Sequence, residues 1–186
     1  MLYWFDKNGI WTIGANITDL NANAATNTST KLTINTLTGF GMGPATLSWS
    51  AIAPGATNST STTVIILNNT GNQDFLVNNI KINSTDLIGE SDSGKALHSG
   101  NFTISNTTSG GKAECDLSNV TASVMNKVSG AGYNTVGGAN LSRGNYTVDD
   151  GRAQENLYVC LAVAGSELSS QAYSTYSKGA WTLSAT

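Results

Sequence analysis

The segment Leu157-Tyr-Val-Cys-Leu-Ala-Val163 is apolar throughout and decides how this 186-residue chain must fold. It is bounded by polar residues and is short, which is typical of a β-strand whose two faces are both covered. The run Val64-Ile65-Ile66-Leu67 has the same character. Both segments are therefore predicted to be central strands of a sheet.

Around these two segments, apolar and polar residues alternate with a period of two, as in half-buried strands. No segment of ten or more residues has a helical period, and Gly, Asn, Asp and Ser mark the turns. The sequence predicts an all-β fold, a β-sandwich with Greek-key or jelly-roll-like connections. The alternating segments begin at Trp11, Leu32, Leu47, Ile80, Phe102, Val120, Tyr146 and Trp181.

Three parts of the chain differ in composition. Residues 1–20 read as an N-terminal strand arm, residues 21–30 as a flexible or extended connector of Asn, Ala, Thr and Ser, and residues 31–186 as the sandwich. A chain terminus is normally polar, whereas Leu2-Tyr-Trp-Phe5 is apolar. We expect this end to be buried, either in the protein's own sheet or in another subunit.

Ten Asn-X-Ser/Thr sequons are the most distinctive motif of the chain, and none has Pro at the middle position. The Asn and Ser/Thr content would produce only about five by chance. We therefore expect covalent N-glycans, and with them an extracellular or cell-surface location. The alternative is that an Asn- and Thr-rich sequence generates sequons freely. The acceptors are Asn16, Asn27, Asn58, Asn68, Asn83, Asn101, Asn106, Asn119, Asn140 and Asn145.

Half of these sequons also fit the strand register. In these sequons the Asn is separated from the neighbouring core residues by an odd number of positions along the strand, so its side chain points to the opposite face. These side chains are therefore expected to face solvent, where a sugar can be attached. These five are Asn16, Asn83, Asn101, Asn119 and Asn145. The others lie in turn-like or linker-like surroundings.

Charge excludes several function classes. Charged residues are 11% of the chain, against roughly 25% in an average soluble domain. The net charge is −3 and the nine Lys and Arg residues are scattered, so no nucleic-acid partner is expected. No apolar run approaches 18 residues, so no membrane span is predicted.

The two cysteines, Cys115 and Cys160, suit a single disulfide in an oxidising compartment. Cys160 is in the most apolar strand, and Cys115 follows the Gly110-Gly111 turn. Two buried free thiols are the alternative. Two cysteines without a CxxC arrangement and one His do not make a metal or redox site.

No catalytic, cofactor or metal site is predicted. Asp149-Asp150-Gly151 and Asp6-Lys-Asn8-Gly9 lack the continuation of a calcium loop. Glu90 and Asp92 could be a carboxylate pair, but they also fit a solvated loop. His98 has no accompanying nucleophile elbow. Gly130-Ala-Gly132 lacks a third Gly and a following helix.

Several segments resemble secreted surface proteins of archaea, especially of small-genome lineages. They are Pro44-Ala-Thr-Leu-Ser-Trp49, Leu67-Asn-Asn-Thr-Gly-Asn72, Asp86-Leu-Ile-Gly-Glu90, Asn101-Phe-Thr103, Gln154-Glu-Asn-Leu-Tyr-Val-Cys-Leu161, Ser170-Gln-Ala-Tyr-Ser-Thr175 and Gly179-Ala-Trp-Thr-Leu183. In architecture alone, a glycosylated sandwich with an apolar arm is similar to archaeal threads and pili assembled by donor-strand complementation.

These features together predict a structural protein rather than an enzyme. We expect the arm to complete the sheet of an identical subunit in a helical polymer, by β-strand addition. Core packing is the expected role of Trp11, Trp49 and Trp181, because each lies on the apolar parity of a strand, and stacking on sugars is the alternative. The alternatives to a filament are a cell-surface adhesion or carbohydrate-binding module and a virion coat protein. The expected interface residues are Trp4, Phe5, Trp11, Ile13 and Ile17.

Overall fold

The computed structural model describes residues 1–106, 108–109, 112–113, 126–128, 130 and 132–186. Regular structure in these residues is almost entirely β-strand, which confirms the predicted all-β class. One short 3₁₀-helix, η1 (Ser99–Asn101), lies among the strands.

The strands fall into an N-terminal pair and a body. The pair is β1 (Gly9–Thr18) and β2 (Ala24–Ile34). The body contains β3 (Phe40–Gly43), β4 (Thr57–Thr60), β5 (Ile65–Asn69), β6 (Ile80–Asn83), β7 (Leu87–Gly89), β8 (Ala96–Leu97), β9 (Phe102–Ser105), β10 (Thr108–Ser109), β11 (Lys112–Ala113), β12 (Asn126–Val128), β13 (Asn134–Thr135), β14 (Gln154–Val163), β15 (Tyr173–Ser174) and β16 (Thr182–Ala185).

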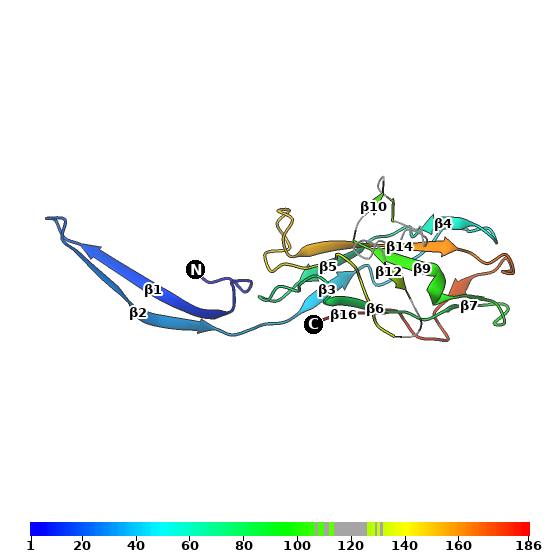
Figure 1. Cartoon of the computed structure of the whole chain (residues 1–186), viewed down its shortest axis with the longest axis horizontal. Coiled ribbons are helices and arrows are strands. Elements are labelled where there is room, and N and C mark those ends of the chain that lie inside the picture. Colours follow the sequence, from blue (N-terminus) through cyan, green and yellow to red (C-terminus); the bar gives the residue numbers. More distant parts are fainter. Residues whose placement is uncertain (107, 110–111, 114–125, 129, 131) are drawn as a thin grey trace.

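All the strand pairs described are antiparallel. The largest sheet has the order β12-β9-β14-β5-β3, with β4 also paired to β14. Two three-stranded sheets, β13-β6-β16 and β15-β7-β8, and the small β10-β11 pair complete the body. The strands of the largest sheet, β12, β9, β14, β5, β3 and β4, are labelled in Figure 1.

The strand β14 is central to the largest sheet, as its apolar sequence predicts. Its residues 154–157 pair with β5, residues 158–161 with β9, and residues 160, 161 and 163 with β4. Leu157, Val159 and Leu161 are at most 1% exposed. A strand with neighbours on both edges and a buried face holds the sheet together.

The hydrophobic core lies between the largest sheet and the β13-β6-β16 sheet, which gives the body a sandwich-like character. Leu67, Phe102 and Leu157 enter this core from the large sheet. Ile80 and Ile82 of β6 belong to the same buried cluster, and Leu183 of β16 packs against it. The apolar residues of these body strands thus meet in one core.

The expectation that Val64–Leu67 is covered on both faces is wrong. Ile65 and Leu67 are buried, but Ile66 between them is 38% exposed. The strand β5 therefore has only one covered face, although it is central in the sheet as predicted, between β14 and β3.

The N-terminal residues form a hairpin that projects from the body (Figure 1). Residues 21–30, expected to be a connector, instead supply part of the turn and most of β2, which pairs with β1 from Thr18–Ala24 to Gly9–Ile34. Residues 31–34 also belong to this hairpin rather than to the body. Threonine is β-branched, and this favours an extended strand over a flexible linker.

The turn of the hairpin is held by one carboxylate. Asp19 Oδ1 accepts hydrogen bonds from the backbone N–H groups of Asn21 (2.8 Å) and Asn23 (2.9 Å). Asp19 Oδ2 accepts another from Asn23 Nδ2 at 2.8 Å. The hydrogen bond from the Asn23 side chain is the main cause that lowers the pKa of Asp19. Aspartate is suited to such turns because its side chain can bind nearby backbone N–H groups.

The first prediction tests the role of β14 in the core. Replacing Leu157→Ala removes buried methyl groups and leaves a cavity, so we expect the free energy of unfolding to fall by about 2–5 kcal/mol. Val163→Ala, in the same strand but 42% exposed, should lower it by less than about 1 kcal/mol. Chemical denaturation of both variants measures the difference. Similar losses in the two would mean that β14 does not hold the core in this way.

Candidate functional site

Every residue of β1 is exposed, although its sequence alternates like that of a core strand. Trp11 is 40% exposed, Ile13 50% and Ile17 72%. These three residues were predicted to lie at a subunit interface, and in the isolated chain nothing covers them fully. A contiguous exposed apolar surface of this kind marks an interaction site.

The hairpin has two different faces, because directly paired residues of an antiparallel ladder project to the same side. Trp11 pairs with Leu32, Ile13 with Thr30, and Ile17 with Ala25. We call these six residues the apolar face. The opposite face carries the pairs Ile10–Thr33, Thr12–Lys31 and Asn16–Thr26.

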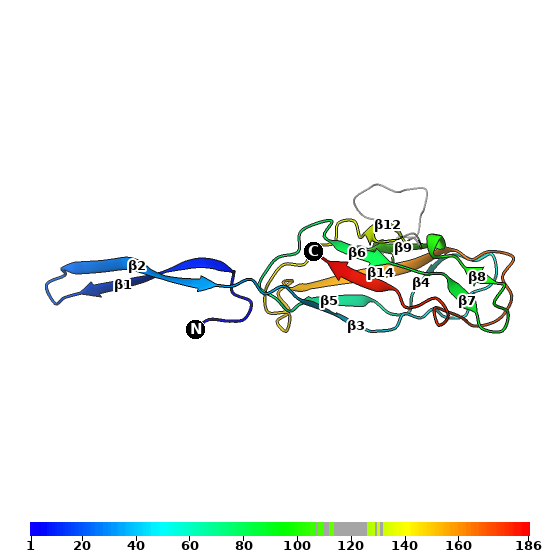
Figure 2. The same cartoon turned by 90° about the horizontal axis from the view of Figure 1, so that it is seen from below.

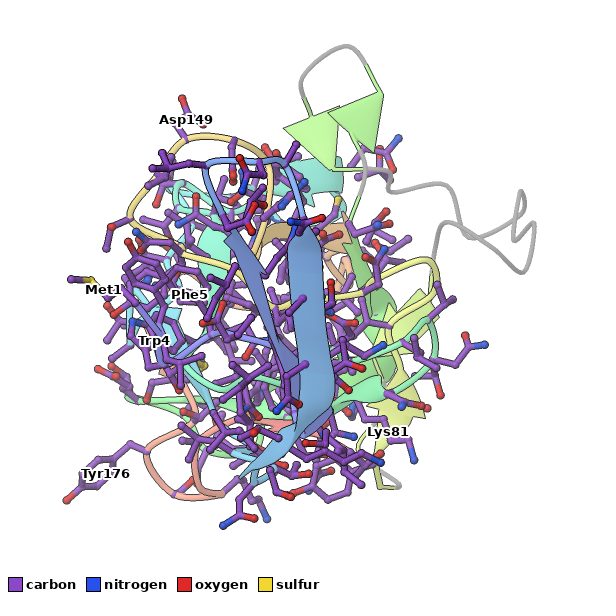
Figure 3. All side chains as sticks on the ribbon, turned by 90° about the vertical axis from the view of Figure 1, so that its left-hand side faces the viewer. Met1, Trp4, Phe5, Lys81, Asp149 and Tyr176 are labelled. Atoms are coloured by element: carbon purple, nitrogen blue, oxygen red, sulfur yellow. The ribbon has the colours of Figure 1, made fainter. Side chains whose placement is uncertain are left out.

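The first residues of the chain anchor the base of the hairpin. The Trp4 ring lies 5.8 Å from that of Tyr146, and Phe5 stacks on Tyr3 at 5.2 Å. Asn8 Nδ2 donates a hydrogen bond to Thr36 Oγ1 at 2.7 Å. Figure 3 looks along the molecule from the hairpin end and shows Met1, Trp4 and Phe5 gathered beside the hairpin. Trp4 and Phe5, predicted as interface residues, thus contact their own chain.

The body has an apolar groove with a volume of about 590 Å³. Its walls come from Met42 of β3, from residues 44–54 that follow this strand, and from the segments containing β7, β8, β15 and β16. None of the described residues that line it is charged. Its apolar lining includes Met42, Leu47, Trp49, Ile52, Leu161 and Leu183.

An aromatic cluster lines the groove where it meets the core. The Phe102 ring centroid lies 5.3 Å from that of Trp49 and 5.0 Å from that of Trp181. Both indoles are half-buried, and their N–H groups donate to backbone carbonyls, Trp49 to Ser59 (3.1 Å) and Trp181 to Thr85 (2.7 Å). The expected core packing of these two tryptophans is therefore found, whereas Trp11 lies on the exposed hairpin.

The groove lies between strands that have unpaired edges. Within the part of the chain that the structure describes, β3 pairs only with β5, and β16 pairs only with β6. Met42 of β3 and Leu183 of β16 both line the groove. Residues 44–56 follow β3 along this side without forming a regular strand. An added strand could therefore hydrogen-bond at either rim.

The described sequon asparagines lie at the surface to different degrees. Asn16, Asn27, Asn58 and Asn140 are exposed, while Asn68, Asn83, Asn101, Asn106 and Asn145 are half-buried. Asn119 is outside the described residues. In two sequons the Asn Oδ1 accepts the hydroxyl of its own Ser or Thr at 2.7 Å: Asn27 from Ser29, and Asn145 from Thr147. Glycosylation at all ten sites stays a prediction.

Cys160 is fully buried in β14 and is disulfide-bonded. Cys115, its predicted partner, lies outside the described residues, so the pairing stays a prediction.

Some of the acidic residues considered from sequence are engaged in local turns. Asp150 Oδ1 accepts from the Arg152 N–H at 3.0 Å, and Asp92 Oδ1 from the Gly94 N–H at 2.9 Å. Within the described ranges, no three His, Cys, Asp or Glu side chains are grouped as metal ligands would be. No helix among the same residues is long and apolar enough to cross a membrane.

Sequence reasoning missed the partner of the single histidine. His98 Nδ1 lies 3.1 Å from Asp86 Oδ2, and the Ser99 N–H donates to Asp86 Oδ1 at 2.7 Å. Partial burial tends to raise the pKa of Asp86, but these hydrogen bonds outweigh it and lower the pKa below its usual value. The pair is joined across twelve positions, and no local motif marks it.

No known family model, curated protein or solved structure matches this chain.

The second prediction concerns Glu155 of β14, whose Oε1 accepts a hydrogen bond from Asn106 Nδ2 at 2.9 Å. Burial raises the pKa of Glu155 above its usual 4.5. The folded chain therefore holds this proton more tightly than the unfolded chain. The contribution of protonated Glu155 to the free energy of unfolding is fully present below about pH 4.5. It is lost as the pH rises through the raised pKa of the folded chain.

Glu155→Gln removes this titration while keeping the hydrogen-bond acceptor. We expect the variant to be more stable than the parent near about pH 7, and the difference to shrink near about pH 4. Glu167→Gln, at an exposed position, is the matched control. Denaturation curves at the two pH values measure the effect. An equal difference at both would contradict the assigned cause.

Proposed function

We propose that this chain is the structural subunit of an extracellular, N-glycosylated filament. In this filament, the N-terminal hairpin of one subunit inserts into the apolar groove of the next by β-strand addition. The observation that carries the proposal is the presence, on one chain, of an exposed apolar hairpin and an uncharged apolar groove beside unpaired strand edges.

The polarity of the two surfaces is complementary. The strand β1 contains no charged residue, and the one charge of β2 is Lys31. Lys31 pairs with Thr12 and so lies opposite the apolar face. The apolar face could therefore enter the groove without burying a charge, which would be strongly unfavourable in a lining that offers no counter-charge.

The backbone can contribute as well as the side chains. Among the residues described, β1 and β2 pair only with each other, so each has one unpaired edge. The rims of the groove, β3 and β16, have unpaired edges too. An exposed edge is a template for pairing with another chain. Insertion would satisfy the N–H and C=O groups of both partners.

The arrangement of the two parts favours an open polymer. The hairpin projects from one end of the body, whereas β7 lies at the opposite end in both views (Figures 1 and 2), with β8 beside it in Figure 2. Leu87 of β7 and Leu97 of β8 line the groove, which therefore reaches that far end. A contact between two different surfaces is head-to-tail and does not close on itself, so it can repeat indefinitely.

The energy of such a contact would come from several side chains. Burying Ile13, Ile17 and Leu32 would stabilise the joint by about 1.5–3 kcal/mol for each side chain. Much of this is offset by the lost freedom of two subunits and of the inserted hairpin. We therefore expect main-chain pairing along the strand edge to be necessary for a stable filament.

The remaining features support the location of the proposed filament. Sequons distributed along the chain would give it a hydrated surface despite its few charges. The disulfide state of Cys160 suits an oxidising environment. The adhesion-module alternative would use the same groove, which Trp49 and Trp181 line. It has less support, because both indole N–H groups are already bonded to backbone carbonyls and the exposed apolar hairpin has no role in it. No specific observation favours a virion coat.

The third prediction compares the two faces of β1. Ile13→Asp places a charge on the apolar face and should abolish filaments, because a carboxylate entering the groove would lose its hydration. Ile10→Asp places the same charge on the opposite face and should leave assembly intact. Electron microscopy and sedimentation measure polymer content. A full-length parent chain that stays monomeric, or equal assembly of both variants, would contradict the proposal.

The fourth prediction tests the groove from its rim. Met42 is 47% exposed, so Met42→Lys should fold normally and yet reduce assembly by putting an unpaired ammonium at the entrance. Val163→Lys changes a comparably exposed residue of β14 that does not line the groove, and it should assemble like the parent. Thermal unfolding checks that both variants are folded. Assembly of the Met42 variant at parental levels would argue against this groove as the acceptor.

A further inference from the structure

The second strand of the hairpin contains a bulge that changes where a sequon points. Between the pairs Ile13–Thr30 and Ala15–Asn27, β1 advances by two residues and β2 by three. An extra residue in one strand shifts every side chain beyond it to the other face. Asn27 therefore lies on the same side as Ile13 and Ile17, whereas regular pairing would have placed it on the opposite side.

The two sequons of the hairpin consequently lie on opposite faces. Asn16 pairs with Thr26 and belongs to the face that also carries Lys31. Asn27 pairs with Ala15, between the pairs that form the apolar face. Both asparagines are exposed in the isolated chain, so both are accessible to a modifying enzyme. A sugar would have different consequences at the two positions.

We propose that Asn27 is a chain-termination site: an oligosaccharide attached there prevents the hairpin from entering a groove but leaves the subunit able to accept a neighbour. This inference rests on the proposed function. A subunit modified at Asn27 adds to a growing filament only through its own groove, and no further subunit can follow on its hairpin. The fraction of Asn27 that is modified then sets filament length.

The physical reason is the polarity of the groove. The groove has a volume of about 590 Å³ and a largely apolar, uncharged lining, in which the polar groups are hydroxyl and amide side chains such as Ser48, Gln171 and Tyr173. An oligosaccharide forced into it beside the hairpin would lose more hydration than those groups replace. The same sugar on Asn16 would project from the opposite face and stay hydrated. Asn27 Oδ1 also accepts hydrogen bonds from the Ser29 N–H (2.8 Å) and hydroxyl (2.7 Å), which fixes the orientation of the acceptor side chain.

The modification itself is the ordinary transfer to an asparagine amide. The Nδ2 atom of Asn27 forms a bond to the anomeric carbon of a lipid-linked oligosaccharide. The bond between that carbon and the phosphate oxygen of the lipid carrier breaks, the lipid phosphate leaves, and the amide loses one proton. No electron is transferred, and the donor is the only co-reactant.

The first test uses full-length protein produced in a host that glycosylates sequons. Filaments and unassembled subunits are separated, and glycopeptide mass spectrometry measures the occupancy of Asn27 and Asn16. We expect at most one modified Asn27 in each filament, at its end, so its occupancy in filaments of ten or more subunits should not exceed about one in ten and should be higher in the unassembled pool. Asn16 occupancy should be equal in both pools. Equal or absent occupancy of Asn27 in both pools overturns the proposal.

Two sequon variants that keep both asparagines give a matched comparison. Ser29→Ala removes the Asn27 sequon, and Thr18→Ala removes the Asn16 sequon. Filaments of the Ser29 variant should be longer than those of the parent, while the Thr18 variant should match the parent. Unchanged length in the Ser29 variant, or the same increase in both variants, overturns the proposal.

A third experiment separates this proposal from the proposed function. Asn27→Cys and Asn16→Cys are each coupled to a maleimide polymer under non-reducing conditions and mixed in small amounts with unmodified protein. The Asn27 conjugate should shorten filaments and the Asn16 conjugate should not. If unmodified protein forms filaments and both conjugates behave alike, termination at Asn27 is wrong while the filament stands. If unmodified protein forms none, both proposals fail.

Discussion

The pairing of β14 with three neighbouring strands is the interaction on which the body depends. Its residues bond to β5, β9 and β4 in turn, and its buried side chains form the centre of the core. The same strand also reaches the acceptor surface, because Leu161 lines the apolar groove. Stability of the fold and shape of the groove are therefore not independent. A change that loosens β14 would be expected to alter both.

The all-β class and the central strand could be predicted from the sequence because both depend on local pattern. Alternation placed Ile80, Ile82 and Leu183 on core-facing strands, and the structure confirms this. The pairing of β1 with β2 was missed, because residues 21–30 look like a linker in composition even though their threonines favour strands. The groove could not have been predicted, since its walls join residues far apart in the chain and depend on an unpaired edge.

The parity argument for the sequons shows how far sequence reasoning can go. Counting residues along a strand assigns an asparagine to the correct face only where the strand is regular. For Asn16 this condition holds, and the residue lies opposite the apolar face of the hairpin. For Asn27 a bulge intervenes, so that counting residues from Ile34 or Leu32 gives the wrong face. Whether a bulge forms is decided by the pairing with the other strand, which no single-strand pattern contains.

A chain with this hairpin must also avoid pairing too early or with the wrong partner. Proteins usually protect exposed strand edges with charged residues, proline or a covering segment. Here, β1 has no charge and β2 has Lys31 alone, so these common protections are nearly absent from the hairpin. The two sequons at Asn16 and Asn27 are then the positions at which bulk and hydration could be added. On this reasoning, the surface that joins subunits and the modification that limits joining belong to one short hairpin.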